Sequence, residues 1–344
     1  MALDGAFLQS VRKELDCLTG GRVDRIHQPS KDEVIISVRQ HGQSVKVLFC
    51  VNASASRVHI TESESDNPNS PPMFCMLLRK HLLGGRLAAV RQDGLERVLF
   101  FDFDCTSDIG DKKKFTAVIE IMGKYSNFML LDSDGKIIDS LKRVTDLMSR
   151  YRVILPGMMY EMPPRTKRLL FTQATREEML TALRNSAGPA SKALLGVFEG
   201  VSPVLTREWA YFAASADKNI EDYTAKETDR LLFAISQAKE RLLGGGEYTI
   251  IKDKNGLPKD FTFIKVYQYG RLMQTCECGG ASETLDRFYM DVSRKLRLKQ
   301  RAEDLFKTLL RLLDRISKRI EKQQADLLEC KNREQYKVYG DLIT

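Results

Sequence analysis

Closely spaced segments with a strand pattern dominate the first 141 residues and limit the folds that this chain can adopt. Alternation of apolar and polar residues over a short segment is typical of an antiparallel strand with one buried face. Asp134-Gly135 is in addition a hairpin signal. We therefore expect a β-rich α+β domain over residues 1–171. Its predicted strands are Glu33–Arg39, Ser44–Asn52, Arg57–Thr61, Arg86–Arg91, Arg97–Asp104, Phe115–Met122, Asn127–Leu131 and Lys136–Leu141.

Two amphipathic helices accompany these strands. The first ends at Gly20-Gly21, and its apolar residues recur at helical spacing, at Leu3, Phe7, Val11, Leu15 and Leu18. The stretch Pro71–Arg86 predicts the second helix, because proline is favoured in a first turn and Gly84-Gly85 is a typical stop. Its last turn is basic, and its expected buried face consists of Phe74, Leu77, Leu78 and Leu82.

Residues 172–243 follow a helical pattern, and part of this segment resembles a helix–hairpin–helix. Such a hairpin, here Leu194–Ala210, brings backbone amides and a helix N-terminus together where a phosphate can bind. The usual glycine–apolar–glycine turn appears as Gly200-Val201-Ser202, which lacks the second glycine. The segment is therefore either a phosphate contact or a small helical spacer.

The remaining residues predict a β-hairpin connector over 244–284 and a coiled-coil helix over 285–344. Strand-like segments at Tyr248–Lys252 and Phe261–Tyr269 define the connector. Because a single heptad seam needs a partner, we expect a truncated coiled coil whose returning helix lies outside this sequence. The seam runs through Ala302, Leu305, Leu309, Leu312 and Ile316.

Composition favours a cytoplasmic protein with a polyanionic partner. The net charge is +8, with 54 Lys and Arg against 46 Asp and Glu. No segment approaches the roughly 20 consecutive apolar residues that a membrane helix needs. The N-terminus, with Asp4, lacks the basic and apolar regions of a signal peptide. The seven cysteines are mostly scattered, as expected of reduced thiols.

Motifs for catalysis or metal binding are not recognisable in this sequence. It contains no P-loop and no Gly-x-Ser-x-Gly elbow. The four histidines show no metal-ligand spacing, and a single Cys276-x-Cys278 pair is weak evidence for zinc. We therefore expect a protein that is not an enzyme and has no cofactor, no catalytic residue and no metal.

Several long motifs resemble the NFACT family of ribosome quality-control proteins, some of which carry the older name fibronectin-binding protein A. The motifs are Arg57–Thr61 (RVHIT), Pro71–His81 (PPMFCMLLRKH), Glu120–Asn127 (EIMGKYSN), Ile154–Tyr160 (ILPGMMY) and Leu285–Tyr289 (LDRFY). The resemblance implies an NFACT-N domain like the N-terminal fold of formamidopyrimidine-DNA glycosylases, then a helix–hairpin–helix and a coiled coil. It also implies binding to the rRNA of an obstructed large ribosomal subunit that carries a stalled peptidyl-tRNA. Recruitment of alanyl-tRNA for mRNA-independent alanine tailing would follow, with the ribosome performing peptidyl transfer.

The family's tRNA-selecting residues are an Asp-Arg pair on a strand and an acidic residue near the N-terminus. They match Glu96-Arg97 and Asp4, with glutamate in place of aspartate. Arg97 would provide a planar fork of donors for a phosphate or a base edge. The alternatives are a cross-strand ion pair for Glu96-Arg97 and a helix N-cap for Asp4.

Further candidate RNA contacts lie at three other places. Lys124 and Asn127 flank a turn that is either a tRNA contact or a solvated β-turn. Arg79 and Lys80 could meet RNA phosphate or form a solvated helix end, and the same alternative holds for Arg294, Lys295 and Arg297 at the base of the coil. Two other functions remain open, a fibronectin-binding adhesin and a DNA-repair protein. The glycosylase chemistry is not expected, because its N-terminal Pro-Glu is absent here.

Overall fold

The computed structural model describes the chain except residues 1–2, 65, 107–109, 150 and 166, and it describes only the backbone at 294–304 and 331–332. The chain divides into two compact units, residues 1–289 and residues 290–344. The expected segments 1–171, 172–243 and 244–284 all fall within the first unit.

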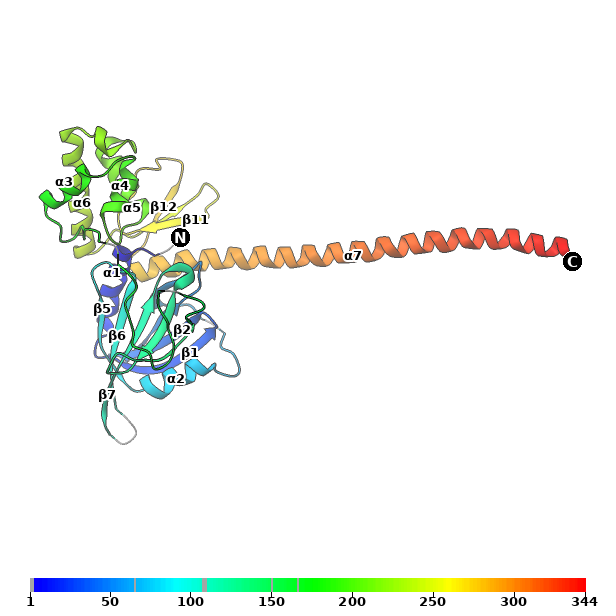
Figure 1. Cartoon of the computed structure of the whole chain (residues 1–344), viewed down its shortest axis with the longest axis horizontal. Helices are drawn as coiled ribbons and strands as arrows, with labels where there is room; N and C mark the ends of the chain where they lie inside the picture. Colours follow the sequence, from blue (N-terminus) through cyan, green and yellow to red (C-terminus); the bar gives the residue numbers. More distant parts are fainter. Residues whose placement is uncertain (1–2, 65, 107–109, 150, 166) are drawn as a thin grey trace. The chain divides into compact units, whose positions relative to one another are not determined.

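A nine-stranded antiparallel sheet forms the larger part of the first unit (Figure 1). Its strand order is β4-β3-β2-β1-β5-β6-β7-β8-β9, so that neighbours in the chain are neighbours in the sheet except where β1 pairs with β5. The mixed α/β class with a large antiparallel sheet agrees with the prediction. The strands are β1 (Arg22–Ser30), β2 (Glu33–Gln40), β3 (Gln43–Cys50), β4 (Arg57–Thr61), β5 (Arg86–Gln92), β6 (Val98–Thr106), β7 (Lys112–Glu120), β8 (Asn127–Leu131) and β9 (Ile137–Ser140).

Strand β1 was not predicted, and its irregular register explains why. The pairing of β1 with β2 shifts between Val23 and Arg25 and again between His27 and Ser30. A bulge inserts an extra residue and moves the following side chains to the opposite face. The buried residues Val23 and Ile26 are therefore three positions apart, and the two-residue alternation that reveals a strand is lost.

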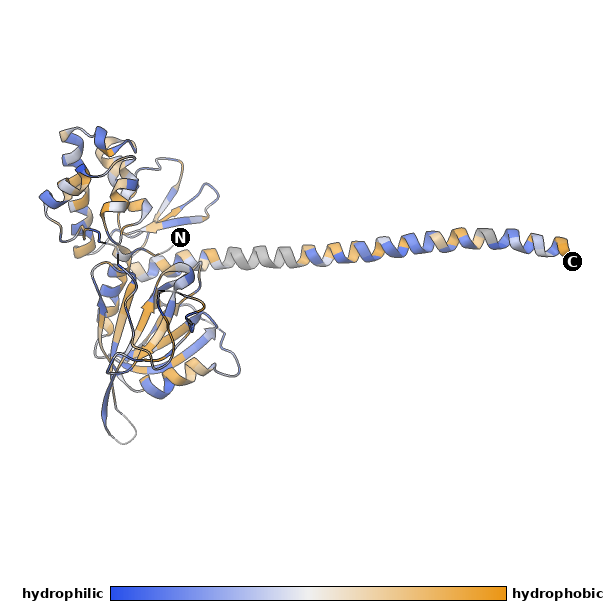
Figure 2. Cartoon of the chain, in the orientation of Figure 1, coloured by the Kyte–Doolittle hydropathy of each residue, from blue (hydrophilic) through white to orange (hydrophobic). Residues whose placement is uncertain are grey.

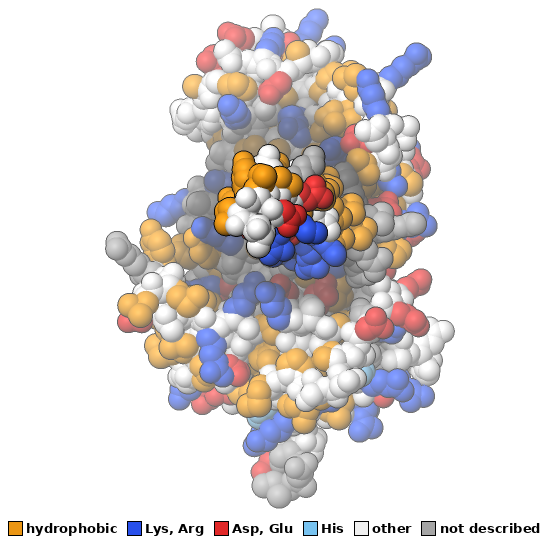
Figure 3. Space-filling view, turned by 90° about the vertical axis from the view of Figure 1, so that its right-hand side faces the viewer, with side chains coloured by type: hydrophobic (Ala, Val, Ile, Leu, Met, Phe, Trp, Pro, Cys, Tyr) orange, Lys and Arg blue, Asp and Glu red, His pale blue; other side chains and the backbone are white. Residues whose placement is uncertain are grey.

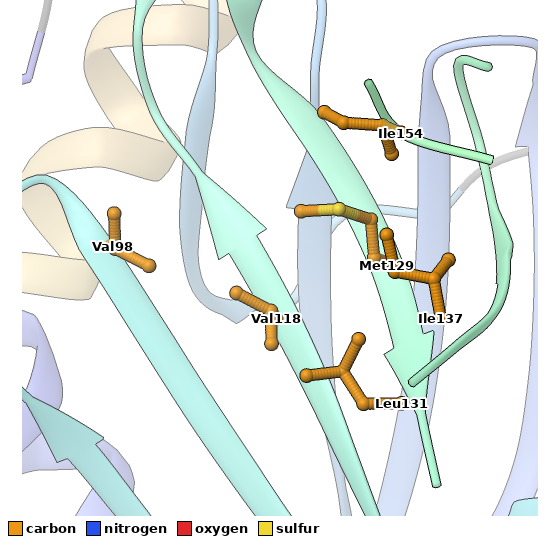
Figure 4. Close-up of a cluster of buried hydrophobic side chains, with 6 residues drawn as sticks. All are labelled: Val98, Val118, Met129, Leu131, Ile137 and Ile154. Atoms are coloured by element: carbon orange, nitrogen blue, oxygen red, sulfur yellow. The ribbon is translucent and has the colours of Figure 1, made fainter. Parts of the chain in front are cut away.

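Two layers cover the two faces of β6–β9. Helix α2 (Met73–Leu82) packs on one face, where the Phe74 ring meets the Phe128 ring edge-on at 5.9 Å. Successive strand residues point to opposite faces, so Met129 lies on the other side. There it joins a cluster to which Ile154, from the segment after β9, contributes (Figure 4). Burial on both faces explains why every residue of β8 is buried.

The buried face of α2 differs from the prediction at one position. Phe74, Leu78 and Leu82 are buried as expected, but Cys75 is fully buried and Leu77 is only half-buried. The Cys75 thiol donates to the Ile26 carbonyl at 3.7 Å, which shows that the helix turns this side toward β1.

Four helices and a small sheet complete the first unit. The helices are α3 (Arg176–Arg184), α4 (Ala190–Val197), α5 (Pro203–Ala214) and α6 (Ala225–Gly244). The sheet has the order β11-β10-β12, with β10 (Thr249–Lys252), β11 (Pro258–Thr262) and β12 (Gln274–Glu277). The strand expected at Phe261–Tyr269 is confirmed only at Phe261 and Thr262, the end of β11, and is wrong beyond them. The amides of Tyr267 and Gln268 bond to the Glu208 carboxylate at 2.9 and 3.1 Å instead of to a strand.

Helix α1 (Gly5–Leu15) supplies the anchor for the last helix, α7 (Ala281–Ile343). Both Glu14 carboxylate oxygens accept first-turn amides of α7, from Ala281 at 2.5 Å and from Ser282 at 2.8 Å. This carboxylate stabilises the helix N-terminus and explains why α7 begins before the expected Leu285.

The second unit is the remaining length of α7, and its described side chains are mostly exposed. Apolar and polar residues are mixed along the part that Figure 2 colours. Four seam residues are exposed by 44–66%, namely Leu305, Leu309, Leu312 and Ile316. A coiled-coil partner therefore remains a prediction.

Candidate nucleic-acid interface

Three segments that are far apart in the sequence meet at the start of α1. The Ala6 amide donates to the Gly200 carbonyl at 2.9 Å, which joins α1 to the loop between α4 and α5. The Gln92 side-chain amide donates to the carbonyls of Gly5 and Glu96, at 2.9 and 2.8 Å, and so joins α1 to the turn between β5 and β6. The predicted candidates Asp4, Glu96 and Arg97 thus belong to one junction.

Glycine makes this close approach possible. A Cβ on Gly5 would overlap the Leu95 carbonyl oxygen, and a Cβ on Gly200 would overlap the Leu95 side chain. Gly200 also has a φ of +69°, a left-handed conformation that favours glycine. The position of the turn that carries Glu96 and Arg97 therefore depends on two glycines outside it.

Asp4 is the N-cap of α1 and lies near enough to Arg97 to be affected by its positive charge. Its Oδ1 accepts the Phe7 amide at 2.6 Å, and it is hydrogen-bonded to the side chain of Ser202. Desolvation raises the pKa of Asp4 to about 6, although these hydrogen bonds and the positive charge of Arg97 act in the opposite direction. Asp4 therefore is the N-cap of α1 and also lies near Arg97.

Glu96 and Arg97 lie in the turn before β6 rather than on a strand, which corrects the expected strand start. They do not form a cross-strand pair. Glu96 Oε1 lies 3.8 Å from the Arg165 Nε, and Arg165 also pairs with Asp93. Among the described residues, the half-buried Arg97 guanidinium has no hydrogen bond or ion pair, and its electrostatic partner is Asp4. Its donors remain available to a ligand.

Arg165 was missed by the sequence analysis. Arg165 lies 69 residues after Glu96, and no local sequence pattern connects these two residues. Glu199 lies near the same turn, and its pKa is raised by desolvation and by the charge of Glu96. Acidic side chains thus surround Arg165, whereas Arg97 forms no ion pair with any residue that the structure describes.

The helical hairpin offers no vacant anion site at the N-terminus of α5. Ser202 caps this helix by accepting the Leu205 amide at 3.4 Å. The Asp4 carboxylate bonds to Ser202 and supplies a negative charge at the same helix end. The structure therefore favours a packing role for Gly200-Val201-Ser202 over phosphate binding.

The turn with Lys124 lies at the same end of the sheet, because the Ile121 amide donates to the Arg97 carbonyl at 2.8 Å. Lys124 is exposed, and its Nζ lies 4.8 Å from the centre of the exposed Tyr125 ring. Asn127 differs from the expectation of a tRNA contact. It is only 1% exposed, and its amide nitrogen donates to the Lys142 carbonyl at 2.6 Å while its oxygen accepts the Lys142 amide at 2.9 Å. Its role here is to position the turn.

The other basic candidates do not join this junction. Arg79 Nε donates to the Ile26 carbonyl at 2.8 Å, and Lys80 is exposed beside it. Their helix end lies at the far end of β6, because His81 meets Phe115, which pairs with Phe103. The side chains of Arg294, Lys295 and Arg297 lie outside the described residues.

A buried carboxyl near Asp4 makes stability depend on pH. Desolvation, together with the charge of Asp4, raises the pKa of Asp260 from 3.8 to about 7, although the Phe261 amide and Arg207 act in the opposite direction. The folded chain therefore holds this proton to a higher pH than the unfolded chain. Stability from Asp260 is present at low pH and is lost as the pH rises from about 4 to about 7.

We expect Asp260→Asn to remove this dependence. Relative to the unsubstituted chain, the free energy of unfolding of the variant should rise by roughly 2 to 4 kcal/mol between pH values of about 4 and 7. Urea unfolding at several pH values measures the difference. Asp253→Asn is the control, because the pKa of the partly buried Asp253 is lowered by amide hydrogen bonds, chiefly that of Leu257, so this substitution should change the pH dependence in the opposite direction. A pH-independent difference for Asp260→Asn would contradict the assignment.

This architecture, a large antiparallel sheet joined to a helical hairpin and a long helix, is shared with known proteins. The chain belongs to the NFACT family, since the family model for the NFACT N-terminal and middle domains matches residues 4–344. Over the full length of this chain, it is 33% identical to the Rqc2 homolog RqcH of Bacillus subtilis, and the match covers 58% of that relative. The human ribosome quality control complex subunit NEMF is 29% identical over 40% of this chain and 12% of its own length.

Two solved structures share the fold. The fibrinogen binding protein from Staphylococcus aureus matches with a TM-score of 0.70 and 30% identity, over 84% of this chain and 99% of its own. The N-terminal part of the fibronectin/fibrinogen-binding protein from Streptococcus suis matches with a TM-score of 0.69 and 29% identity, over 84% of this chain and all of its own. The chain thus spans more than half the length of its curated relative from B. subtilis. Among its described helices, none is long and apolar enough to cross a membrane.

Proposed function

We propose that this chain is the RNA-binding part of a cytoplasmic factor in ribosome-associated quality control. Its relatives named RqcH and NEMF support this proposal. The factor would bind the rRNA of an obstructed large ribosomal subunit that carries a stalled peptidyl-tRNA. It would recruit alanyl-tRNA for alanine tailing of the nascent chain, with peptidyl transfer performed by the ribosome.

The single observation that supports the proposal most strongly is that the Arg97 guanidinium is unpaired among the described residues. This guanidinium has no hydrogen-bond or ion-pair partner among the described residues, and it lies in a turn held by contacts to Gly5 and Gly200. A planar guanidinium can bind a phosphate or a base edge through two parallel hydrogen bonds. Preorganisation lowers the entropy lost on binding. We therefore assign the main tRNA contact to Arg97.

Neighbouring residues extend this contact in the proposal. Asp4 provides a negative charge near Arg97, and Glu96 pairs with Arg165. Lys124 and Tyr125 add an exposed cation and a ring on which a base can stack. Asn127 supports their turn from within.

The proposal is tested by recovering the full-length protein from cells and sequencing the RNA that copurifies. We expect one tRNA species to dominate, together with rRNA of the large subunit. An Arg97→Gln variant, recovered in parallel, should retain rRNA and lose the tRNA enrichment. Scattered RNA that dissociates with modest salt would contradict the proposal, because it would indicate binding by charge alone.

The names of the two solved structures favour one other candidate, an adhesin that binds fibronectin or fibrinogen. An antibody against the chain, applied to intact and to permeabilised cells, separates the two functions. Labelling of permeabilised cells alone is the result expected for a factor of ribosome quality control. Labelling of intact cells would support the adhesin.

A further inference from the structure

Three arginines stand side by side on neighbouring strands of the large sheet. Arg22 of β1 lies directly opposite Arg39 of β2, and it also lies opposite Arg86 of β5. Side chains of directly opposed residues share one face of the sheet, with Cβ atoms about 5 Å apart. All three arginines are exposed. We call Arg22, Arg39 and Arg86 the arginine row.

The arginine row is only partly compensated by carboxylates, because Asp104 of β6 lies directly opposite Arg86. Among the described residues, Arg22 and Arg39 have neither an ion pair nor a side-chain hydrogen bond, and an Arg86 Nη1 donates to the Gly20 carbonyl at 3.0 Å. The nearby Asp24 carboxylate lies 3.9 Å from Arg25. Like charges that face each other across strands are destabilising. At Arg22 and Arg39, which form no ion pair among the described residues, an external anion would offset this cost.

A hollow beside the row provides space for such an anion. It has a volume of about 450 Å³. Gly84 lies close to the Arg22 guanidinium, because a Cβ on Gly84 would be 3.2 Å from an Arg22 Nη2, and the φ of Gly84, +80°, favours glycine. The hollow is lined by Arg22, Val23, Asp24, Arg39, Leu83 and Gly84.

More basic residues lie at the same end of the sheet. Arg86 pairs with Asp104, and Asp104 pairs with Lys114 on the next strand. The pKa of His81 is lowered by burial and by the charges of Lys80 and Lys113, so α2 ends close to β7. On the face drawn in Figure 3, Lys and Arg are interspersed with Asp and Glu. In the register of the sheet, the arginine row places three arginines on adjacent strands.

We propose that the arginine row binds backbone phosphates of RNA. Guanidinium groups match phosphate oxygens with paired, charge-assisted hydrogen bonds. The row lies at the opposite end of β6 from Arg97, since Arg86 pairs near the last residues of β6 and Arg97 precedes its first. The contact is thus a second one, independent of base sequence. This inference rests on the proposed function in one respect only, which is the choice of RNA as the polyanion that binds the arginine row.

The test compares Arg22→Gln/Arg39→Gln with Arg184→Gln/Arg230→Gln in the whole chain. Arg184 and Arg230 are exposed and, among the described residues, unpaired, so both variants lose two positive charges. Binding of a fluorescent RNA duplex of arbitrary sequence is measured by anisotropy over a range of salt concentrations. Each phosphate contact contributes about 0.9 to the slope of log K against log salt. We expect the row variant to lower this slope by about 1.8 and the control to leave it unchanged.

Two results would overturn the proposal. One is an equal slope for the row variant and the control, and the other is no binding of the duplex by the unsubstituted chain at low salt. Thermal melting gives an independent check, because removing unpaired like charges should keep or raise the melting temperature. A lower melting temperature would show that the arginines hold the fold instead. Since the duplex carries no tRNA identity, these results do not depend on tRNA selection at Arg97.

Discussion

Replacing Glu96 and Arg97 with alanine should weaken selective tRNA binding by roughly tenfold to a hundredfold. The physical reason is the loss of the Arg97 guanidinium, which forms no ion pair among the described residues and lies near the charge of Asp4. A two-bond contact from arginine to a base or phosphate contributes about 1 to 3 kcal/mol. Binding of the cognate and of a non-cognate tRNA to the full-length protein, measured by anisotropy at one salt concentration, gives the change in selectivity.

The matched control is Arg176→Ala/Asp229→Ala. This pair also has no net charge, and its two side chains are 61% and 63% exposed on the helical segment. Exposed ion pairs contribute little to stability, so the control should bind and melt like the unsubstituted protein. Unchanged tRNA selectivity in a folded Glu96→Ala/Arg97→Ala variant would show that the junction does not contact tRNA.

Gly5→Ala should have the largest effect on folding. Its Cβ would overlap the Leu95 carbonyl oxygen, which is backbone and cannot rotate away. Either α1 or the turn between β5 and β6 must shift, and we expect a loss of about 3 kcal/mol in the free energy of unfolding. Urea unfolding monitored by circular dichroism measures this loss.

Gly196→Ala is the control for this substitution. Gly196 lies within α4, and nothing lies within 4 Å of its added Cβ. Alanine at an unobstructed helical position should stabilise the chain by about 0.5 to 1 kcal/mol. Similar stabilities for Gly5→Ala and Gly196→Ala would mean that the contact between α1 and Leu95 is not as close as the structure shows.

Most of the predicted strands and the helices near the N-terminus are confirmed, because local periodicity determined them. Strand β4 and strand β8 have the expected bounds, and α2 has the expected basic end. Prediction failed where a distant partner replaces a local one. The bulges of β1 hide its alternation, and the Glu208 carboxylate takes the amides that a strand at Phe261–Tyr269 would need.

The sequence predicted three residues of the candidate site, but it did not predict how they are arranged. Family motifs pointed to Asp4, Glu96 and Arg97, and the structure brings them to one junction. Arg165 has no sequence signal, because its partner Glu96 is joined to it only by tertiary packing. Asn127 has a polar side chain in a polar turn, and only its burial and its bonds to Lys142 show a structural role.

The sequence by itself determined the strands and helices with regular spacing, the basic charge and the family. These properties depend on the order of neighbouring residues, which a periodic pattern records. Only the tertiary structure decided that Gly5, Leu95 and Gly200 touch and that Arg97 is left without an ion pair. It also placed Arg22, Arg39 and Arg86 in one row. Such contacts arise when separate elements pack to bury their apolar faces, and no local pattern specifies which polar side chains then meet.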